Sequence, residues 1–383
     1  MLLYIHIPFC RQKCRYCAFA SEVWQEAAAE ENVRLILREA RQRLNEVTEP
    51  IETVYLGGGT PSLLPPAMLR TLLSGLKSVF PLDQVHEFTS EANPGTLTDE
   101  WLDAAAGAGV NRLSLGVQAS QPELLRTLGR IHSFPQAVSA FRTARAHGFS
   151  NLSMDLIFGI PGQTLRDWRE TLEQILDLAP EHLSAYGLIP EEGTPLFRDL
   201  EEGRLVLPEP ETEREMYELA VRMTRAAGLE QYEISSFARP GYACRHNIGY
   251  WIQKPYLGLG VSAASMRIRQ TGKNGMICLR KTNPSERNAY ALSVRSGPPD
   301  ESVWEVVGPA DACFETMMLG LRMNRGVDET DFRALHGVEL DACYGDRLRK
   351  LEKEGLAAHR DHRWFLTRRG FDIQNSILVE LMD

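Results

Sequence analysis

Hydrophobic positions follow two alternating periods along the first half of the chain, and this alternation predicts a repeated strand–helix unit. Short runs rich in β-branched and aromatic residues predict strands at 2–7, 53–56, 85–92, 112–118, 152–158 and 182–188. Apolar residues at helical spacing predict helices between them, at 24–47, 66–80, 99–107, 135–147 and 165–178. Such alternation indicates parallel strands with helices packed outside. Since no Gly-x-Gly-x-x-Gly follows the first strand, an incomplete (β/α) barrel is favoured over a dinucleotide-type sheet.

The pattern changes after the sixth predicted strand. Residues 191–215 are acidic and rich in proline, a helix is predicted at 213–227, and the Gly-rich run 256–260 resembles a strand. A Gly-Pro-Pro linker at 297–299 precedes a helical region with a final hairpin at 362–367. The predicted fold class is therefore α/β, with a partial (β/α)6 TIM-like barrel core at 1–190, a connecting segment at 191–300 that extends the barrel, and a small C-terminal winged-helix-like α+β domain at 310–383.

The ends of the predicted strands carry the candidate chemistry. In barrels of this kind, reacting groups lie at the carboxyl ends of the strands. In chain order these ends carry a cysteine loop, a triple glycine, Glu91, Gln118, Asp155 and Ile189. A polar residue that stands alone at a strand end is more often a helix cap or a hydrogen-bonded core residue. Because these ends converge in one barrel, we expect them to line one pocket.

The cysteine loop is the most informative of these strand ends. Cys10, Cys14 and Cys17 form a C-x3-C-x2-C run within eight residues. Three thiolates suit an iron–sulfur cluster, and one ligand fewer than a closed site leaves an iron open to an outside ligand. A structural zinc site needs a fourth ligand, which no nearby His or second C-x2-C supplies. Disulfides would leave an odd cysteine and would need an oxidising compartment.

Composition narrows the class of protein. Of the 383 residues, 43% are hydrophobic and 24% are charged, as in an ordinary globular protein with a sizeable core. The net charge of −9 argues against nucleic acid as the main partner. No apolar run is long enough for a membrane span, and the first residues lack the basic start of a signal peptide. Seven cysteines, an odd number, favour a reducing cytoplasm.

The C-terminal module has a local basic excess. Residues 346–369 hold eight Lys or Arg against four Asp or Glu. Winged helices bind DNA, but they also serve as docking or lid domains. Since no aromatic–basic interleaving or long basic stripe is present, docking or covering the barrel mouth is favoured over nucleic-acid binding.

The glycine turn after the second predicted strand completes a recognisable pattern. Gly57 to Pro61 would let backbone amides approach a ligand closely, and Thr60 adds a hydroxyl. A ligand that both chelates iron and contacts this turn could be an amino-acid head group. Cys10-x3-Cys14-x-Tyr16-Cys17 followed by this turn resembles the radical S-adenosylmethionine superfamily. The resemblance implies a [4Fe–4S] cluster held by the three cysteines and an S-adenosylmethionine whose sulfonium the cluster cleaves to a 5′-deoxyadenosyl radical.

Further motifs narrow the resemblance to one branch of the superfamily. The segments 4–10, 91–94, 115–118, 128–132, 154–159 and 193–196 are similar to the branch that holds the oxygen-independent coproporphyrinogen III dehydrogenases and the HemW-type haem chaperones. That likeness covers nearly the whole chain. It implies that S-adenosylmethionine contacts Tyr4, Gly58, Gly59, Thr60, Glu91, Gln118, Arg130 and Asp155. Arg130 can pair with its carboxylate, while carboxylates and amides can hold its amine and ribose hydroxyls.

Two departures distinguish the members of that branch. The dehydrogenase carries a fourth cysteine where this chain has Phe19, and it has a long extension before the segment that holds Tyr4. Both departures favour the haem chaperone, with haem as cargo, apo-haemoproteins as recipients, and flavodoxin or ferredoxin as electron donor. The alternative is a radical enzyme such as the coproporphyrinogen III oxidase itself.

The resemblance also singles out a candidate haem ligand. His246-Asn247-x-x-Tyr250-Trp251 resembles the haem-binding motif proposed for the chaperones, and an imidazole in an aromatic setting suits a haem iron. A lone histidine beside aromatic residues is also often structural, and Cys244 is a softer alternative ligand. Chaperones usually carry a histidine soon after the Gly-x-Gly run, where this chain has Ala264. That departure puts the full ligand set in question.

Overall fold

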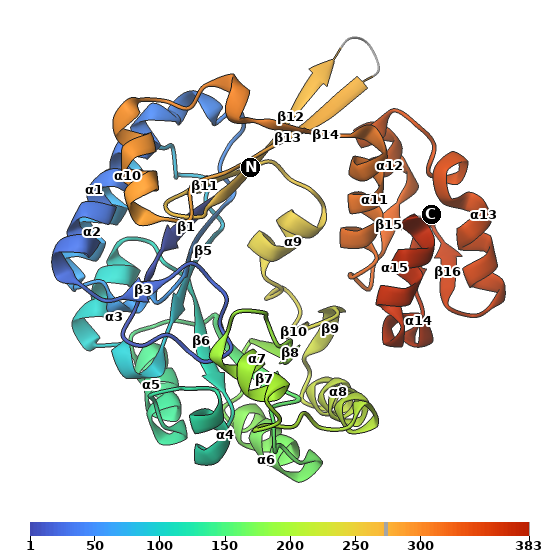
Figure 1. Cartoon of the computed structure of the whole chain (residues 1–383), viewed down its shortest axis with the longest axis horizontal. Coiled ribbons are helices and arrows are strands. Elements are labelled where there is room, and N and C mark those ends of the chain that lie inside the picture. Colours follow the sequence, from blue (N-terminus) through green and yellow to red (C-terminus); the bar gives the residue numbers. More distant parts are fainter. Residues whose placement is uncertain (272–274, 383) are drawn as a thin grey trace.

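The computed structural model describes residues 1–271 and 275–382. Its main feature is a curved sheet, twelve-stranded in this part of the chain, with helices along its outer face (Figure 1). The central strands run in the order β1 (Leu2–Ile7), β4 (Thr53–Gly58), β5 (Glu87–Ala92), β6 (Arg112–Gln118), β7 (Leu152–Phe158) and β8 (His182–Gly187), and all are parallel. The predicted partial barrel of six strands is confirmed.

The helices between these strands form the outer layer. They are α1 (Glu26–Gln42), α2 (Pro66–Val79), α3 (Asp99–Gly107), α4 (Pro122–Thr127), α5 (Phe134–Ala146) and α6 (Leu165–Leu176). Their apolar faces meet the sheet in one core, in which Trp101 and Trp168 are fully buried. The predicted helix 24–47 is shorter in the structure, because Arg43 leaves the helix and buries its guanidinium between Glu39, Glu46 and the carbonyl oxygen of Gly258.

Later segments extend the sheet at both edges. Beyond β1 lie β11 (Tyr256–Leu259), β12 (Ala264–Thr271), β13 (Gly275–Thr282) and β14 (Glu305–Val307). Beyond β8 lie β10 (Ser236–Ala238) and β9 (Glu230–Glu233). Of these, β11 pairs parallel with β1, whereas β10 and β12 add antiparallel strands. The helices α7 (Pro195–Glu201), α8 (Pro210–Ala226), α9 (Arg245–Trp251) and α10 (Arg287–Ser296) complete this part of the chain.

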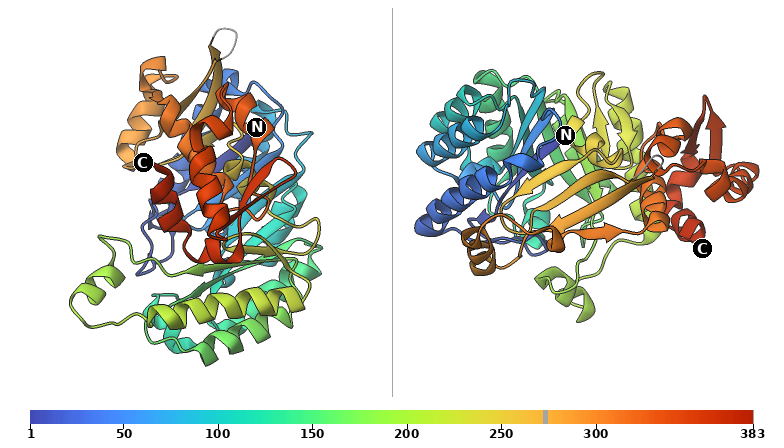
Figure 2. Two further views of the ribbon diagram at one scale, coloured as in Figure 1. Left: turned by 90° about the vertical axis from the view of Figure 1, so that its right-hand side faces the viewer. Right: turned by 90° about the horizontal axis from the view of Figure 1, so that it is seen from above.

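The C-terminal part packs beside the open side of the curved sheet and has its own hydrophobic core (Figures 1 and 2). It contains α11 (Pro309–Gly320), α12 (Glu329–His336), α13 (Leu340–Lys353), α14 (Arg368–Asp372), α15 (Gln374–Met382) and the strands β15 (Val327–Asp328), β16 (Ala357–Arg360) and β17 (Arg363–Leu366). The predicted small α+β region is confirmed. Its hairpin begins before residue 362, because Asp361 and His362, both at positive φ, form the turn between β16 and β17.

In residues 1–271 and 275–382, no helix combines the length and apolar character that a bilayer crossing requires.

Candidate functional site

The cysteine loop follows β1 and faces a cavity of about 420 Å³ at the strand ends. Cys10, Cys14 and Cys17 all line this cavity, and all three are free thiols. The loop is fixed by backbone hydrogen bonds, among them Arg15 N to Leu128 O at 3.0 Å and Cys17 N to Cys14 O at 3.3 Å. We call this cavity the thiol pocket.

Two neighbouring groups donate hydrogen bonds to the cysteine sulfurs. Thr60 Oγ1 lies 3.6 Å from Cys10 Sγ, and Arg130 Nη1 lies 3.3 Å from Cys14 Sγ. In the part of the chain that the structure describes, no three His, Cys, Asp or Glu side chains converge closely enough to hold one metal ion. The ligands of an iron–sulfur cluster are thiolates spread around several irons, so a loop that presents three thiols to one cavity fits a cluster better than a single ion.

The glycine turn lies directly against the loop. Gly59 N donates a hydrogen bond to Ile7 O at 2.8 Å, and a Cβ at this position would lie 2.6 Å from Phe9 O. Gly58 has a φ of 106° and packs against the ring of His6. Only glycine satisfies both positions without strain, so the turn brings its backbone to the cavity wall.

A half-buried carboxylate lies behind the glycine turn. Glu91, at the end of β5, accepts hydrogen bonds from Tyr55 Oη at 2.9 Å and from Gly58 N at 3.0 Å. Burial raises the pKa of Glu91 to about 7, and the Tyr55 hydrogen bond acts in the opposite direction. Glu91 is therefore poised to change charge near neutral pH.

A second half-buried carboxylate lies two strands further along. Asp155, on β7, accepts hydrogen bonds from Ser114 Oγ at 2.8 Å and from Ser153 Oγ at 3.1 Å. Burial raises the pKa of Asp155, and the Ser114 hydrogen bond opposes the rise. Gln118 ends β6 with a φ of 71°, next to a register shift between β6 and β7. This unusual backbone directs the end of β6 into the same pocket.

Arg130 links the cysteine loop to the strand ends. Its guanidinium donates hydrogen bonds to Gly116 O at 2.7 Å, to Cys14 Sγ and to Asn93 Oδ1. Asn93 in turn donates to Thr60 Oγ1 at 3.0 Å. One connected hydrogen-bond network therefore fixes the positive charge beside the thiols.

Most of the residues predicted from the sequence line the thiol pocket. They are Cys10, Cys14, Cys17, Gly58, Gly59, Thr60, Glu91, Gln118, Arg130 and Asp155, together with Ile189. Tyr4 and His246 do not line it. The hydroxyl of Tyr4 contacts His6 Nδ1 at 3.0 Å, and its ring faces a second, larger cavity.

His246 is buried inside the barrel, beneath the thiol pocket. It is 1% exposed; its Nδ1 lies 2.8 Å from Thr53 Oγ1, and its Nε2 lies 3.1 Å from Tyr250 Oη. Burial, and then the charge of Arg112, lowers the pKa of His246 to about 3. Its backbone N also donates to Glu87 Oε1 at 3.0 Å. With both ring nitrogens occupied, the imidazole faces neither cavity.

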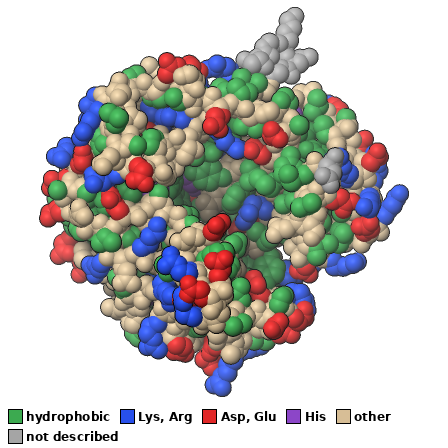
Figure 3. Space-filling model, viewed as in Figure 1, with side chains coloured by type: hydrophobic (Ala, Val, Ile, Leu, Met, Phe, Trp, Pro, Cys, Tyr) green, Lys and Arg blue, Asp and Glu red, His purple; other side chains and the backbone are tan. Residues whose placement is uncertain are grey.

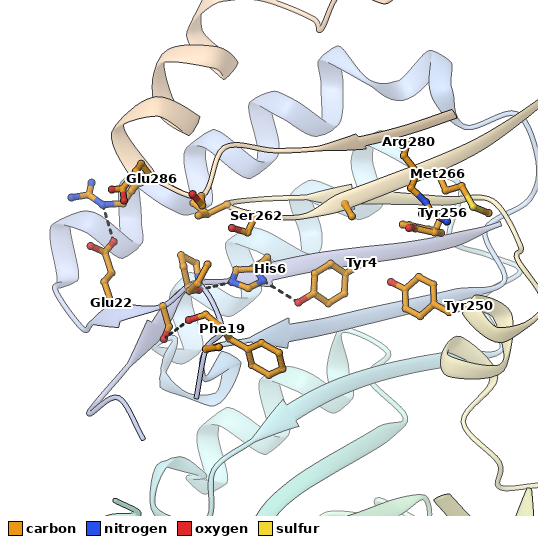
Figure 4. A pocket seen from close by; sticks show the side chains of 18 of the residues that line it. Tyr4, His6, Phe19, Glu22, Tyr250, Tyr256, Ser262, Met266, Arg280 and Glu286 are labelled. Carbon is orange, nitrogen blue, oxygen red and sulfur yellow. Dashed lines mark hydrogen bonds and ion pairs between the residues drawn. The ribbon is translucent and has the colours of Figure 1, made fainter. Parts of the chain in front are cut away.

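The second cavity, drawn in Figure 4, is larger, about 1070 Å³, and it adjoins the thiol pocket through lining residues that the two share. Its walls come from β1, β11, β12, β13, α9, α10 and α11. The space-filling view shows a hollow at the centre of this face, with hydrophobic side chains gathered on its right-hand wall (Figure 3). Lys13, Ala18, Phe19 and Ser21 line both cavities. We call it the large cavity.

Sequence reasoning missed several residues of the thiol pocket. Tyr55 and Asn93 hold Glu91 and Arg130 in place, and Arg112 is buried in the wall with no hydrogen-bond partner for its Nε among the described residues. Asn93 directly follows the Glu91–Ala92 strand end, and its place beside a strand end could have identified it as a pocket residue. A buried Arg112 at the start of a strand gives no such signal, because charged residues at strand starts are usually solvated.

Comparison with known proteins gives consistent matches over the whole chain. Residues 4–175 match the family model described as Radical SAM superfamily, and residues 307–373 match that of the HemN C-terminal domain. The chain is 36% identical over 378 residues to "Heme chaperone HemW" of Bacillus subtilis, which covers 98% of this chain and 97% of that protein. It is 35% identical over 382 residues to "Heme chaperone HemW" of Escherichia coli, covering 98% and 96%.

A more distant match comes from a solved structure. Coproporphyrinogen III oxidase (HemN) from Escherichia coli superposes with a TM-score of 0.81 at 22% identity, covering 100% of this chain and 90% of that chain. This likeness concerns the fold, and it agrees with the partial barrel and the C-terminal α+β region described above.

Proposed function

The chain belongs to the radical S-adenosylmethionine superfamily and, within it, to the family of the heme chaperone HemW, and from this premise we propose that it binds haem and delivers it to apo-haemoproteins. The observation that carries the proposal is the near-complete alignment with the HemW proteins together with the pairing of two adjoining cavities. One cavity is small and lined by thiols, and the other is large, with tyrosines, methionines and charged side chains in its wall.

We propose that Cys10, Cys14 and Cys17 hold a [4Fe–4S] cluster in the thiol pocket. Thiolates are the ligands of such clusters, and the hydrogen bonds from Thr60 and Arg130 would stabilise their negative charge. Half-buried free thiols such as these three persist in a reducing compartment, which supports a cytoplasmic location. When bound, the cluster would supply single electrons, and a flavodoxin or ferredoxin is the class of donor that could reduce it.

S-adenosylmethionine is proposed to occupy the remainder of the thiol pocket. Arg130 would pair with its carboxylate, and the backbone of Gly58 and Gly59 would border its methionyl part. Glu91 and Asp155 are half-buried acceptors for its amine and ribose hydroxyls, with Gln118 and Thr60 as further polar contacts. Tyr4 belongs to the same set by resemblance, although its ring lines the neighbouring cavity.

A radical enzyme that decarboxylates coproporphyrinogen III is the alternative function. Phe19 bears on it, because this side chain is 64% exposed and lies at the border of the two cavities. The dehydrogenases carry a cysteine at that place by resemblance, and a phenyl ring supplies neither a thiol nor a proton. This favours a cargo-binding role over the decarboxylation.

The test uses the reconstituted full-length protein under anoxic, reducing conditions. We expect haem titration to give a saturable Soret band at one haem per chain, and incubation with S-adenosylmethionine and coproporphyrinogen III to leave the porphyrinogen unchanged. Conversion to protoporphyrinogen would show that the protein is the radical enzyme and not a haem chaperone. Absence of a saturable Soret change would remove haem as the cargo.

A further inference from the structure

The large cavity has the dimensions of a ligand site and is separate from the thiol pocket. Its volume of about 1070 Å³ lies at the upper end of the range of small-molecule sites, roughly 300–1,000 Å³. The thiol pocket, at about 420 Å³, is already assigned to the cluster and the nucleotide cofactor. A macrocycle added to those two groups would exceed its volume, whereas the adjoining cavity has room for it.

The wall of the large cavity suits a flat apolar ring. Tyr4, Tyr250 and Tyr256 present aromatic rings along one side, and the Tyr250 and Tyr256 ring centroids lie 4.8 Å apart (Figure 4). Met266 and Met318 add polarizable thioethers. Because the Tyr250 and Tyr256 rings are nearly perpendicular, at 88°, one can stack on a porphyrin while the other meets it edge-on, and both contacts bury apolar area.

The rim of the cavity holds basic and acidic side chains in equal number, Lys13, Arg280 and Arg287 against Glu22, Glu286 and Glu315. Arg280 and Arg287 line opposite parts of it, each paired with a glutamate: Arg280 Nη1 lies 2.6 Å from Glu315, and Arg287 Nε lies 2.8 Å from Glu22. Lys13 is exposed at the border with the thiol pocket and has no carboxylate partner among the described residues. Ammonium and guanidinium groups bind carboxylates by charge-assisted hydrogen bonds, so Lys13 is available to a propionate without losing an existing pair.

The cavity also contains its own candidate donors for iron. Met and Tyr side chains both serve as axial ligands of haem iron, and Met266, Met318 and Tyr256 all line the cavity. His246 does not reach it. Instead, its Nε2 contacts Tyr250 Oη at 3.1 Å, which fixes the Tyr250 ring in the cavity wall, while Thr53 fixes the imidazole from the other side.

We propose that haem lies in the large cavity against Tyr250 and Tyr256, and that His246 is a positioning residue that acts through Tyr250 and does not ligate the iron. This inference rests on the proposed haem-binding function and adds where the haem lies. It also places the cargo beside the cluster with Phe19 between them, because Phe19 lines both cavities.

The first experiment fills the cavity. Ala264, on β12, and Met318, on α11, approach it from two sides, so Ala264→Trp and Met318→Trp each reduce its volume independently. We expect haem affinity, measured by Soret titration of the reconstituted protein, to fall by at least about tenfold in each variant. Cluster iron content and S-adenosylmethionine binding should remain, and they also report that the variant is folded. Ala67→Trp, on the exposed face of α2, is the matched control.

The outcomes separate this inference from the proposed function. If the unaltered protein binds no haem, the proposed function fails. If it binds haem and both filled variants bind it equally well with cluster and cofactor retained, the placement in the large cavity is wrong. If the filled variants alone lose haem, the placement is supported.

The second experiment tests the role of His246. His246→Gln keeps hydrogen-bonding capacity, so we expect the Soret position and the electron paramagnetic resonance signature of bound ferric haem to be unchanged and the affinity to stay close to that of the unaltered protein. His246→Ala and Tyr250→Phe should each weaken haem binding by roughly fivefold, the effect of losing one hydrogen bond, with the same spectrum. If His246→Gln changes the spectrum as His246→Ala does, while Tyr250→Phe has no effect, His246 is the ligand and the inference is overturned.

Discussion

The thiol pocket and the large cavity lie side by side but are built in different ways. The thiol pocket is made of polar groups at successive strand ends, and these groups are bonded to one another: Glu91 to Tyr55 and Gly58, and Arg130 to Asn93. The large cavity is lined by tyrosines, methionines and charged side chains that come from segments far apart in the chain. Preorganised polar networks suit fixed reactive groups, whereas a wall with adaptable thioethers suits a cargo that must leave again.

The largest expected effect comes from removing the thiols. With Cys10, Cys14 and Cys17 all replaced by Ala, we expect iron and acid-labile sulfide to fall to background, because the described pocket contains no other thiol. Haem affinity should stay within about twofold, since independent sites contribute additively. Iron and sulfide assays on anoxically prepared protein, with Soret titration, measure both effects.

The matched control for the thiols is the double change Cys278→Ala and Cys343→Ala, which removes two cysteines outside the pocket. It should keep full iron and sulfide. Unchanged iron in the triple variant would refute the assignment of the cluster, and loss of haem binding together with iron would mean that the two cavities act as one site.

A smaller effect is expected from the pH dependence of Glu91. Its pKa is about 7 in the folded protein, raised from its ordinary value of 4.5 chiefly by burial. Between these two values the folded protein holds a proton that the unfolded chain has released, so the contribution of Glu91 to stability falls as pH rises through this window. An ammonium group prefers the carboxylate, so affinity for S-adenosylmethionine should rise over the same window, approaching tenfold per pH unit below about 7.

Equilibrium dialysis of S-adenosylmethionine at pH values between the two pKa values of Glu91 measures the rise in affinity. Thermal unfolding of the cofactor-free protein over the same pH range measures the fall in stability. Glu91→Gln should flatten both curves, whereas Glu123→Gln, an exposed control on α4, should leave both slopes intact. A slope that persists in Glu91→Gln would show that another group is responsible.

The sequence allowed the thiol pocket to be predicted far better than the large cavity, and the reason is physical. Parallel strands place their carboxyl ends at one edge, so the positions of Glu91, Gln118 and Asp155 at strand ends were enough to bring them together. The large cavity depends on β11 pairing parallel with β1 and on α11 packing against α9. The first contact joins residues more than two hundred positions apart and the second joins helices separated along the chain by the strands β11 to β14 and by α10, so local periodicity contains no information about either.

His246 illustrates the same limit. The motif 246–251 indicated an aromatic environment correctly, since the His246 ring packs 5.0 Å from that of Tyr55 and 4.9 Å from that of Tyr250. The direction of the imidazole depends on Thr53, on a strand that the chain reaches almost two hundred residues earlier. Hydrogen-bond partners such as Thr53 decide whether a histidine faces a cavity or the interior, and the motif alone does not reveal them.

The smallest expected effect concerns Phe19, the side chain shared by the two cavities. Phe19→Ala should weaken haem binding by roughly twofold to tenfold, the range expected for the loss of one aromatic contact, and should leave affinity for S-adenosylmethionine unchanged. Soret titration and dialysis measure the two ligands separately. Val23→Ala, another exposed apolar residue near the same loop that lines neither cavity, is the control. If Phe19→Ala weakened the binding of both ligands equally, the ring would support the cysteine loop as a whole. Phe19 would then not separate two binding sites, and the two cavities would have to be treated as one.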